Sequence, residues 1–434
     1  MSEKSSQLNR SIGLVALVLF GVGDILGAGI YGLVGKAAGQ MGNAVWLAFL
    51  ASMIAAGLTG LSYASLGSRY PVASGASYIA QRAYQRVWLS YGVGLAILAS
   101  GMTSMATATR VFSGYFQGLL GSEIPISFII IGFALLLAGL VFWGIKESMW
   151  ANAVCTVIEL GGLLLIIIFG FRFIGSVDYL DATTVANPTG DLGFSLILTG
   201  AVLTFYSFIG FEDILNVAEE VKNPKRNLPL GLLLAVSIAS LIYMSISVIA
   251  VSVVPANELA NSKQPLVDVM KVSAPWFPSS VYSIIAMFAV ANTALLNFVM
   301  GSRLIYGMSN QGLLPKVLSK VHAKTHTPYI ATFGILVILL ALALSGEVTS
   351  LAKSTSLLLL LCFMLVNIAL IILKKRAGEP QGSFEIPTFV PVLGALVCAG
   401  MLFYVQGPEI KTAGIIIISI AVLYFVVKPK AVCE

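Results

Sequence analysis

The chain has 434 residues, of which 58% are hydrophobic and only 10% are charged, and its formal net charge is +6. An ordinary soluble domain carries about a quarter charged residues, so this composition excludes a water-soluble globular protein. The positive charge is not concentrated on any soluble domain, so a nucleic-acid-binding function is excluded as well.

Stretches without charged residues recur along the chain, and each is close to the roughly 20 residues that a helix needs to cross a bilayer. Twelve stretches or near-stretches can be counted. They lie near residues 11–35, 42–66, 87–117, 124–145, 148–171, 192–215, 228–254, 277–308, 328–346, 352–373, 387–406 and 411–427. The sequence therefore predicts an all-α polytopic membrane protein with 12 transmembrane helices.

The distribution of basic residues predicts the orientation of these helices. An even number of crossings puts both termini on one side, and most of the 25 Lys and Arg residues then flank that side. We therefore expect both termini to be cytoplasmic, with residues 1–10 and 428–434 as short tails. Short loops and a single membrane domain over 1–434 suit the plasma membrane of a prokaryote, its inner membrane.

Two of the expected crossings contain glycines that weaken a helix. The first reads GVGDILGAGIYG and the sixth TFYSFIGFEDIL, and an interior glycine costs about 1 kcal/mol relative to alanine. Close helix packing through Gly23 and Gly27 is one explanation. We expect instead a broken helix in both crossings, because they occupy corresponding positions of two five-helix repeats, the pattern that marks a transporter binding site.

A broken crossing frees peptide groups that cannot stay unpaired in hydrocarbon, so it must line a hydrated cavity or hold a ligand. The half-helix that begins near Gly29 would direct its amides and positive dipole end at an anion. The carbonyls that end the preceding half would face a cation. A zwitterion fits both ends.

Several motifs in the same order resemble the amino acid-polyamine-organocation transporters. They are GAGIY at 27–31, RYPVASGASY at 69–78, GIKES at 144–148, SFIGFE at 207–212, EEVKNPKRNLP at 219–229 and GSRLIYGMSNQGLLP at 301–315. The resemblance implies a five-plus-five inverted-repeat, LeuT-like core, with repeats at 11–171 and 192–373 and two accessory helices at 387–427. It also implies secondary active transport of amino acids by alternating access, in which helices one, two, six and seven rock against the rest.

The resemblance further implies where a substrate binds, between helices one and six. The substrate carboxylate would meet the amides of Ala28, Gly29 and Ile30. The substrate amino group would meet carbonyls at Ile25 and at Phe208, Ile209 and Gly210.

Side chains around the breaks are further candidates for substrate contact. Tyr206 and Phe208 would gate the site as aromatic rings that can contact a cation, although lipid-facing aromatics are the alternative. Glu212 stands where relatives carry a carboxylate. In the eighth crossing Thr293 and Asn297 share a face with Asn292 and would contact substrate or ion, with interhelical hydrogen bonding as the alternative.

Glu159 occupies the place where many members of this family carry a lysine in the fifth helix that is thought to stand in for a sodium ion. A carboxylate reverses that charge, so we expect Glu159 to bind a proton or Na⁺, together with Asp24 and Thr293. The alternative is a structural ion pair, for which Arg110 is the only deep basic partner. Asp24, Glu159 and Glu212 together suggest tolerance of cationic or amine-rich substrates.

Other functions are less compatible with the sequence. No Gly-rich phosphate loop is present, no cofactor is expected, and the spacing of His322 and His326 lacks a third ligand, so no metal site is expected. A channel would need repeated polar rings, and an intramembrane enzyme would need clustered acidic ligands or a His base. A polyamine or organic amine transporter and an amino acid exchanger remain open, as does the choice between monomer and homodimer.

Overall fold

The computed structural model describes residues 12–72, 75–120, 124–143, 145–185, 187–310, 312–322, 327–405 and 407–429. The N-terminal segment 1–10 and most of the tail 428–434, both expected to be cytoplasmic, lie outside these residues. Within the described residues every regular element is helical, and extended chain pairs only at one bridge between Ile12 and Val221. The all-α expectation is confirmed.

The elements follow one another as α-helices and short 3₁₀ segments (η). In order they are α1 (Leu14–Ile25), α2 (Ala28–Met41), η1 (Gly42–Ala44), α3 (Val45–Arg69), α4 (Gly75–Tyr84), α5 (Val87–Leu120), α6 (Ile126–Trp143), α7 (Ile145–Gly170), η2 (Phe171–Phe173), α8 (Phe194–Phe205), η3 (Tyr206–Phe208) and η4 (Phe211–Glu220). They continue with α9 (Pro224–Val253), α10 (Ala256–Asn261), α11 (Pro265–Ser273), α12 (Ser279–Asn310), η5 (Lys316–Ser319), α13 (Tyr329–Ser345), α14 (Val348–Lys375), α15 (Phe389–Phe403) and α16 (Gly407–Val427).

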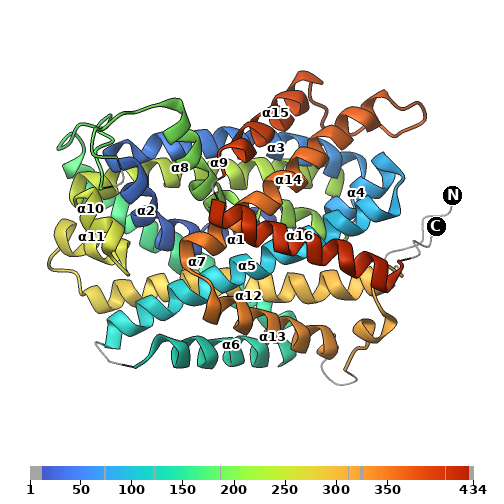
Figure 1. Ribbon diagram of the computed structural model, residues 1–434, viewed down its shortest axis with the longest axis horizontal. Helices are drawn as coiled ribbons and strands as arrows, with labels where there is room; N and C mark the ends of the chain where they lie inside the picture. The colour runs from blue at the N-terminus through green and yellow to red at the C-terminus, as the bar shows by residue number, and fades with distance from the viewer. Residues whose placement is uncertain are drawn as a thin grey trace.

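Eight helical stretches among the described residues are long and apolar enough to cross a bilayer, and three shorter apolar helices accompany them. Such lengths and compositions are those of a multi-pass membrane protein. The long helices lie side by side, with α5 packed along α12 and α14 (Figure 1). Short helices mark the two ends of this bundle, which we call the α4 end and the α10 end after α4 and α10.

The first apolar stretch is interrupted in its middle. Helix α1 ends at Ile25, Leu26 is extended, and Gly27 has a φ of 118° before α2 begins at Ala28. Glycine adopts this φ without strain, whereas an L side chain rarely does. A Cβ at Gly27 would also lie 2.1 Å from Thr293 Oγ1, so the break needs glycine for two reasons.

A second interruption faces the first. Helix α8 passes into η3, Ile209 is extended, and Gly210 has a φ of 119° before η4 begins. A Cβ at Gly210 would lie 2.7 Å from the carbonyl oxygen of Asp24 in α1. The two breaks are therefore in direct contact, which defines the centre of the bundle.

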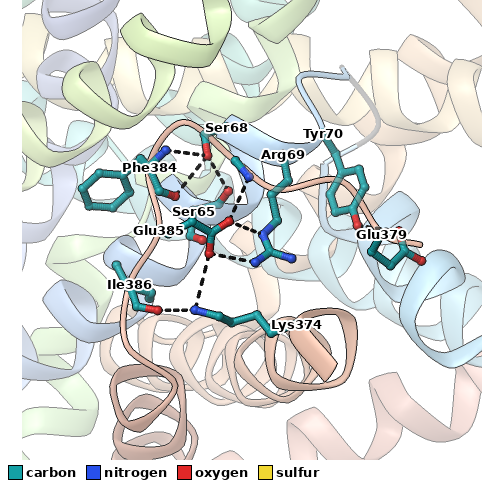
Figure 2. Close-up of polar contacts among 10 residues, drawn as sticks. Ser65, Ser68, Arg69, Tyr70, Lys374, Glu379, Phe384, Glu385 and Ile386 are labelled. Atoms are coloured by element: carbon teal, nitrogen blue, oxygen red, sulfur yellow. Dashed lines mark hydrogen bonds and ion pairs between the residues drawn. The ribbon is translucent and has the colours of Figure 1, made fainter. Parts of the chain in front are cut away.

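The α4 end is held together by a cluster of charged and phenolic side chains, the α4-end cluster, which comprises Arg69, Tyr70, Arg82, Lys374, Arg376, Glu379 and Glu385. Figure 2 shows Arg69 and Lys374 directed at the carboxylate of Glu385. Arg69 donates through Nε and Nη2 at 2.8 and 2.7 Å, and Lys374 Nζ lies at 3.4 Å. These contacts join the ends of α3 and α14 to the segment before α15.

A second carboxylate of this cluster, Glu379, joins α4 to the same segment. It accepts hydrogen bonds from the Tyr70 hydroxyl at 2.7 Å and from Arg82 Nε at 2.8 Å (Figure 2 shows the first). Burial alone would raise the pKa of Glu379, but these donors hold its pKa below the ordinary value. Glu379 is therefore an ionised anchor at neutral pH.

Candidate functional site

A small cavity lies where the two breaks meet. Its volume is about 30 Å³, enough for a water molecule but not for an amino acid. The residues that line it come from α1, α2, α5, η3, η4, α12 and α14. Binding of any larger molecule therefore requires these elements to move apart.

Most of the residues that the sequence analysis selected line this cavity. They are Asp24, Ile25, Ala28, Gly29, Tyr206, Ile209, Gly210, Glu212, Thr293 and Asn297. These residues are up to 273 positions apart (Asp24 to Asn297) and meet because the two broken crossings pack against each other, α1 against η4 and α2 against η3, while α12 packs against α1 and α2.

Three selected residues lie outside the cavity wall. Ile30 is fully buried in α2. Phe208 is buried with its ring 5.2 Å from that of Tyr243, in an edge-on arrangement. Glu159 is buried behind the first break, in α7. The burial of both Tyr206 and Phe208 rules out the alternative that they are lipid-facing aromatics.

Peptide groups freed by the breaks already have partners within the protein. The amide of Ala28 donates to Thr293 Oγ1 at 3.3 Å, and the carbonyl of Ile25 accepts a hydrogen bond from the Tyr243 hydroxyl at 2.5 Å. The amide of Gly210 donates to Glu212 Oε2 at 3.0 Å. Thr293 and Tyr243 therefore occupy positions at which the sequence analysis expected substrate atoms.

Acidic groups dominate the charge of the cavity. Asp24, Glu212 and Asp213 line it, and no Lys, Arg or His is among the described residues of its wall. Asp24 Oδ2 is buried without a hydrogen-bond partner in the described part of the chain. Since a buried unpaired charge costs several kcal/mol, this arrangement favours a cation or a shared proton.

Glu159 is the most isolated acidic side chain of the described residues. Its side chain is fully buried, and neither carboxylate oxygen has a hydrogen-bond partner there. Oε1 is 3.3 Å from the point that a Cβ on Gly27 would occupy, and its backbone carbonyl accepts from the Tyr31 hydroxyl at 3.0 Å. Glu159 thus lies directly behind the first break, beside Thr293.

The alternative of an ion pair between Glu159 and Arg110 is wrong. Arg110 donates to the carbonyl of Ala343 in the last turn of α13, and it lines a separate pocket with Glu347. It lies near the α10 end of α5, where its guanidinium reaches the surface and does not need a partner in the apolar interior.

The polar face of α12 has divided roles. Asn292 Nδ2 donates to Asn152 Oδ1 at 2.9 Å, so for Asn292 the interhelical alternative is confirmed. Thr293 contacts the first break, and Asn297 Nδ2 donates to the Thr293 carbonyl at 2.9 Å while its side chain lines the cavity. His326, half of the noted His pair, lies outside the described residues.

The sequence analysis did not predict that α5 and α9 contribute residues to the site. Ser100, Gly101 and Ser104 line the cavity from α5, and Ser104 Oγ lies 3.1 Å from the Tyr206 hydroxyl. The i, i+4 spacing of the two serines, which puts small polar groups on one helical face, was the available signal. Tyr243 of α9 carried no such signal, because a single tyrosine in an apolar helix is usually packing.

The sequence matches the amino acid permease family over residues 12–427, nearly its whole length. The chain belongs to the amino acid permease family. The resemblance to the amino acid-polyamine-organocation transporters is thereby confirmed, and this permease is a transporter and not an enzyme.

Curated relatives of the permease agree with the family. It is 29% identical over 424 residues to a branched-chain amino acid permease of Bacillus subtilis, covering 93% of this chain and 88% of the relative. It is 26% identical over 429 residues to a methylthioribose transporter of the same organism, covering 93% and 90%. It is 30% identical over 407 residues to cationic amino acid transporter 4 of Mus musculus, covering 88% of this chain but only 62% of that relative.

Proposed function

We propose that this permease is a secondary active transporter that moves amino acids across the plasma membrane by alternating access. The observation that carries the proposal is the meeting of two helix breaks, at Leu26–Gly27 and Ile209–Gly210, around one cavity with acidic walls. A single enclosed site between movable half-helices suits a carrier, whereas a channel needs a continuous pore.

The proposed topology has twelve crossings. The segments α1–α2, α3, α5, α6 and α7 form the first repeat, and α8–η4, α9, α12, α13 and α14 form the second. Helices α15 and α16 are accessory. The α4 end, which carries the Arg and Lys residues of the α4-end cluster, faces the cytoplasm of a prokaryotic cell with both termini.

Substrate binding replaces internal hydrogen bonds. The carboxylate of the amino acid accepts hydrogen bonds from the amides of Ala28, Gly29 and Ile30, once the bond from the Ala28 amide to Thr293 Oγ1 has broken. Its ammonium group donates hydrogen bonds to the carbonyls of Ile25 and of residues 208–210 and to the nearby Glu212 carboxylate. Each bond exchanged is worth roughly 0.5–1.5 kcal/mol, so the net cost of opening stays small.

Tyr206 forms one wall of this site. Its hydroxyl is hydrogen-bonded to Ser104 of α5, so the ring lies between η3 and α5 in the cavity wall, and we assign it the role of closing the cavity. Phe208 supports the closed form from behind, through its contact with Tyr243. Breaking the Tyr206–Ser104 bond is then a step in opening, and Asn297 contacts substrate from α12.

Coupling is assigned to Glu159, with Asp24 and Thr293 nearby. A fully buried carboxylate without a partner among the described residues carries a proton or holds a cation, because ionisation alone would cost several kcal/mol. Its Oε1 lies 3.3 Å from the position that a Cβ on Gly27 would occupy, and this proximity links that event to the first break. Binding of H⁺ or Na⁺ there is proposed to bias the break toward one conformation.

The test is uptake of labelled L-leucine and L-arginine by proteoliposomes under an imposed proton or sodium gradient. Glu159→Gln should lose gradient-driven accumulation but keep counterflow, which shows that the variant still folds and exchanges substrate. The control is Glu258→Gln, an exposed glutamate in α10. Gradient-driven accumulation by Glu159→Gln equal to that of the unaltered protein contradicts the coupling role, and absence of saturable uptake contradicts the proposed function.

A second candidate function is transport of polyamines or other organic amines. The three carboxylates of the cavity wall favour it, because they could replace the role of the α2 amides for a substrate without a carboxylate. Competition of L-arginine uptake by putrescine separates the two. Stronger competition by putrescine than by unlabelled arginine or alanine would favour the amine carrier.

A further inference from the structure

A second and wider pocket lies at the α10 end. Its volume is about 430 Å³, compared with about 30 Å³ for the central cavity. This size falls within the ~300–1,000 Å³ typical of small-molecule sites. Its walls come from α2, α5, α6, the end of α10 and the start of α14.

The two pockets follow the same pair of helices. In α2 Gly29 lines the central cavity and Lys36 lines the wider pocket, while in α5 Ser104 lines the first and Arg110 the second. At 1.5 Å per residue these positions are about 10 Å apart along each helix. The wider pocket therefore lies directly beyond the central cavity, toward the α10 end.

A tight contact separates the two pockets. A Cβ on Gly32 of α2 would lie 2.6 Å from Val111 Cγ2 of α5, so the helices touch there. The contact is braced by the Tyr115 hydroxyl, which donates to the carbonyl of Tyr31 at 2.8 Å. Separation of α2 from α5 at Gly32 would connect the wider pocket to the central cavity.

No two of the charged groups that line this pocket lie within ion-pair distance of each other among the described residues, although Glu347 is close enough to Arg110 to attract it electrostatically. Lys36 Nζ donates to the carbonyl of Ala260 at 2.7 Å, Lys263 Nζ donates to Gln117 Oε1 at 3.0 Å, and Arg110 donates to the carbonyl of Ala343. All three acceptors are neutral. Glu347 lines the same pocket, yet within the described residues it forms no ion pair with any of these three.

This distribution fits a ligand with both charges. An arginine fork matches a carboxylate through two parallel N–H bonds, and one of the five N–H groups of Arg110 is engaged by Ala343. A carboxylate such as Glu347 binds an ammonium group. Val111 and Ile126 add apolar surface to the pocket wall.

We propose that this pocket is a docking site for the α-amino acid zwitterion on its way to the central cavity, with Arg110 binding the carboxylate and Glu347 the ammonium group. Lys36 and Lys263 add positive potential that draws the carboxylate in. The order of events rests on the proposed transport function, whereas the site itself does not.

The test measures ligand occupancy at the pocket directly. Thr349 lines it, so Thr349→Cys is placed in a background in which Cys155, Cys362, Cys398 and Cys433 are replaced by alanine. The purified protein in lipid nanodiscs is reacted with an anionic (sulfonatoethyl) and a cationic (trimethylammonium-ethyl) methanethiosulfonate. We expect about tenfold faster reaction with the anionic reagent, because a basic pocket concentrates anions.

Protection identifies the ligand. L-leucine or L-arginine should slow the modification, whereas the decarboxylated analogues isoamylamine and agmatine should not. Arg110→Gln should abolish the protection and reduce the preference for the anionic reagent, to which Lys36 and Lys263 still contribute, and Arg110→Lys should keep the preference but weaken the protection. The control Lys271→Gln removes a positive charge from exposed α11, outside the pocket, and should change neither.

Several results would overturn the proposal. Equal protection by inorganic phosphate would identify a general anion site, and a rate that follows phosphatidylglycerol content but ignores amino acids would identify a lipid headgroup site. Absence of protection by both amino acids also overturns it. Protection without proteoliposome uptake would retain this site and reject the proposed function, whereas uptake without protection would do the reverse.

Discussion

Replacing Gly27 by alanine tests the geometry of the first break. The φ of 118° is strained for any L side chain, at about 1–3 kcal/mol. The new Cβ would lie 2.1 Å from Thr293 Oγ1, and such overpacking adds about 1–3 kcal/mol. We expect Gly27→Ala to lower the free energy of unfolding by about 2–6 kcal/mol, the sum of these two effects.

The two effects can be separated with a second substitution. Thr293→Ala removes the clashing hydroxyl and alone loses the hydrogen bond from the Ala28 amide, worth about 0.5–1.5 kcal/mol. The double variant should therefore recover the overpacking part of the Gly27→Ala loss, a coupling of about 1–3 kcal/mol, and retain the backbone part.

The measurement is equilibrium unfolding in mixed micelles, followed by tryptophan fluorescence, for the single and double variants. The matched control is Gly161→Ala in α7, where an added Cβ meets nothing within 4 Å. Alanine should be neutral or slightly stabilising there. If Gly27→Ala is as stable as Gly161→Ala, the first crossing does not break at Gly27 and the reasoning about the site fails.

Three further predictions concern the second break and the α4-end cluster. Gly210→Ala should destabilise at least as much as Gly27→Ala in the same assay, and trimming a neighbour should not rescue it, because the clash at 2.7 Å is with the backbone carbonyl of Asp24. Glu385→Gln should lower the unfolding free energy by about 1–3 kcal/mol because Arg69 loses its partner in a buried setting, while Lys271→Gln, at an exposed pair, should stay within about 1 kcal/mol. Burial acts to raise the pKa of Glu385, but the hydrogen bonds from Arg69 and the Gly382 amide hold this pKa below the ordinary glutamate value of about 4.3. The stabilisation by the Arg69–Glu385 ion pair is therefore complete above that ordinary value, and it is lost as the pH falls through the lower pKa of the folded state. The difference in melting temperature between Glu385→Gln and the unaltered protein should accordingly be constant from pH 6 to 8 and shrink in more acidic buffer, and a change within pH 6 to 8 would contradict the assignment.

The helical character and the breaks could be predicted because they follow from local rules. Long apolar stretches can satisfy their peptide groups in a bilayer only as helices. The glycine cluster around Gly27 and the single glycine Gly210 mark positions that need a positive φ. The half-helix that the sequence analysis predicts to begin near Gly29 begins at Ala28. The convergence of Asp24, Glu212 and Thr293 on one cavity followed from the position of both breaks in the bundle.

Contacts between helices that lie far apart along the chain could not be predicted from the sequence. Arg110 reads as a deep charge because its segment is apolar, yet α5 extends to Leu120 and carries Arg110 toward the α10 end, where it meets Ala343 and Glu347. Helix length past the apolar core decides this, and composition does not encode it. Tyr243 supplies the partner of the Ile25 carbonyl from α9, and that pairing depends on helix rotation alone.

The internal hydrogen bonds at the breaks change how binding energy is used. A broken helix in hydrocarbon would be unstable if its peptide groups waited unpaired for a substrate. Here Thr293, Tyr243 and Glu212 satisfy one such group each at 2.5–3.3 Å. A substrate must then exchange bonds with these side chains, so it is selected for reproducing their geometry at several points together. An incomplete ligand, such as an amine without a carboxylate, frees Thr293 from Ala28 without supplying a new acceptor and should bind more weakly for that reason.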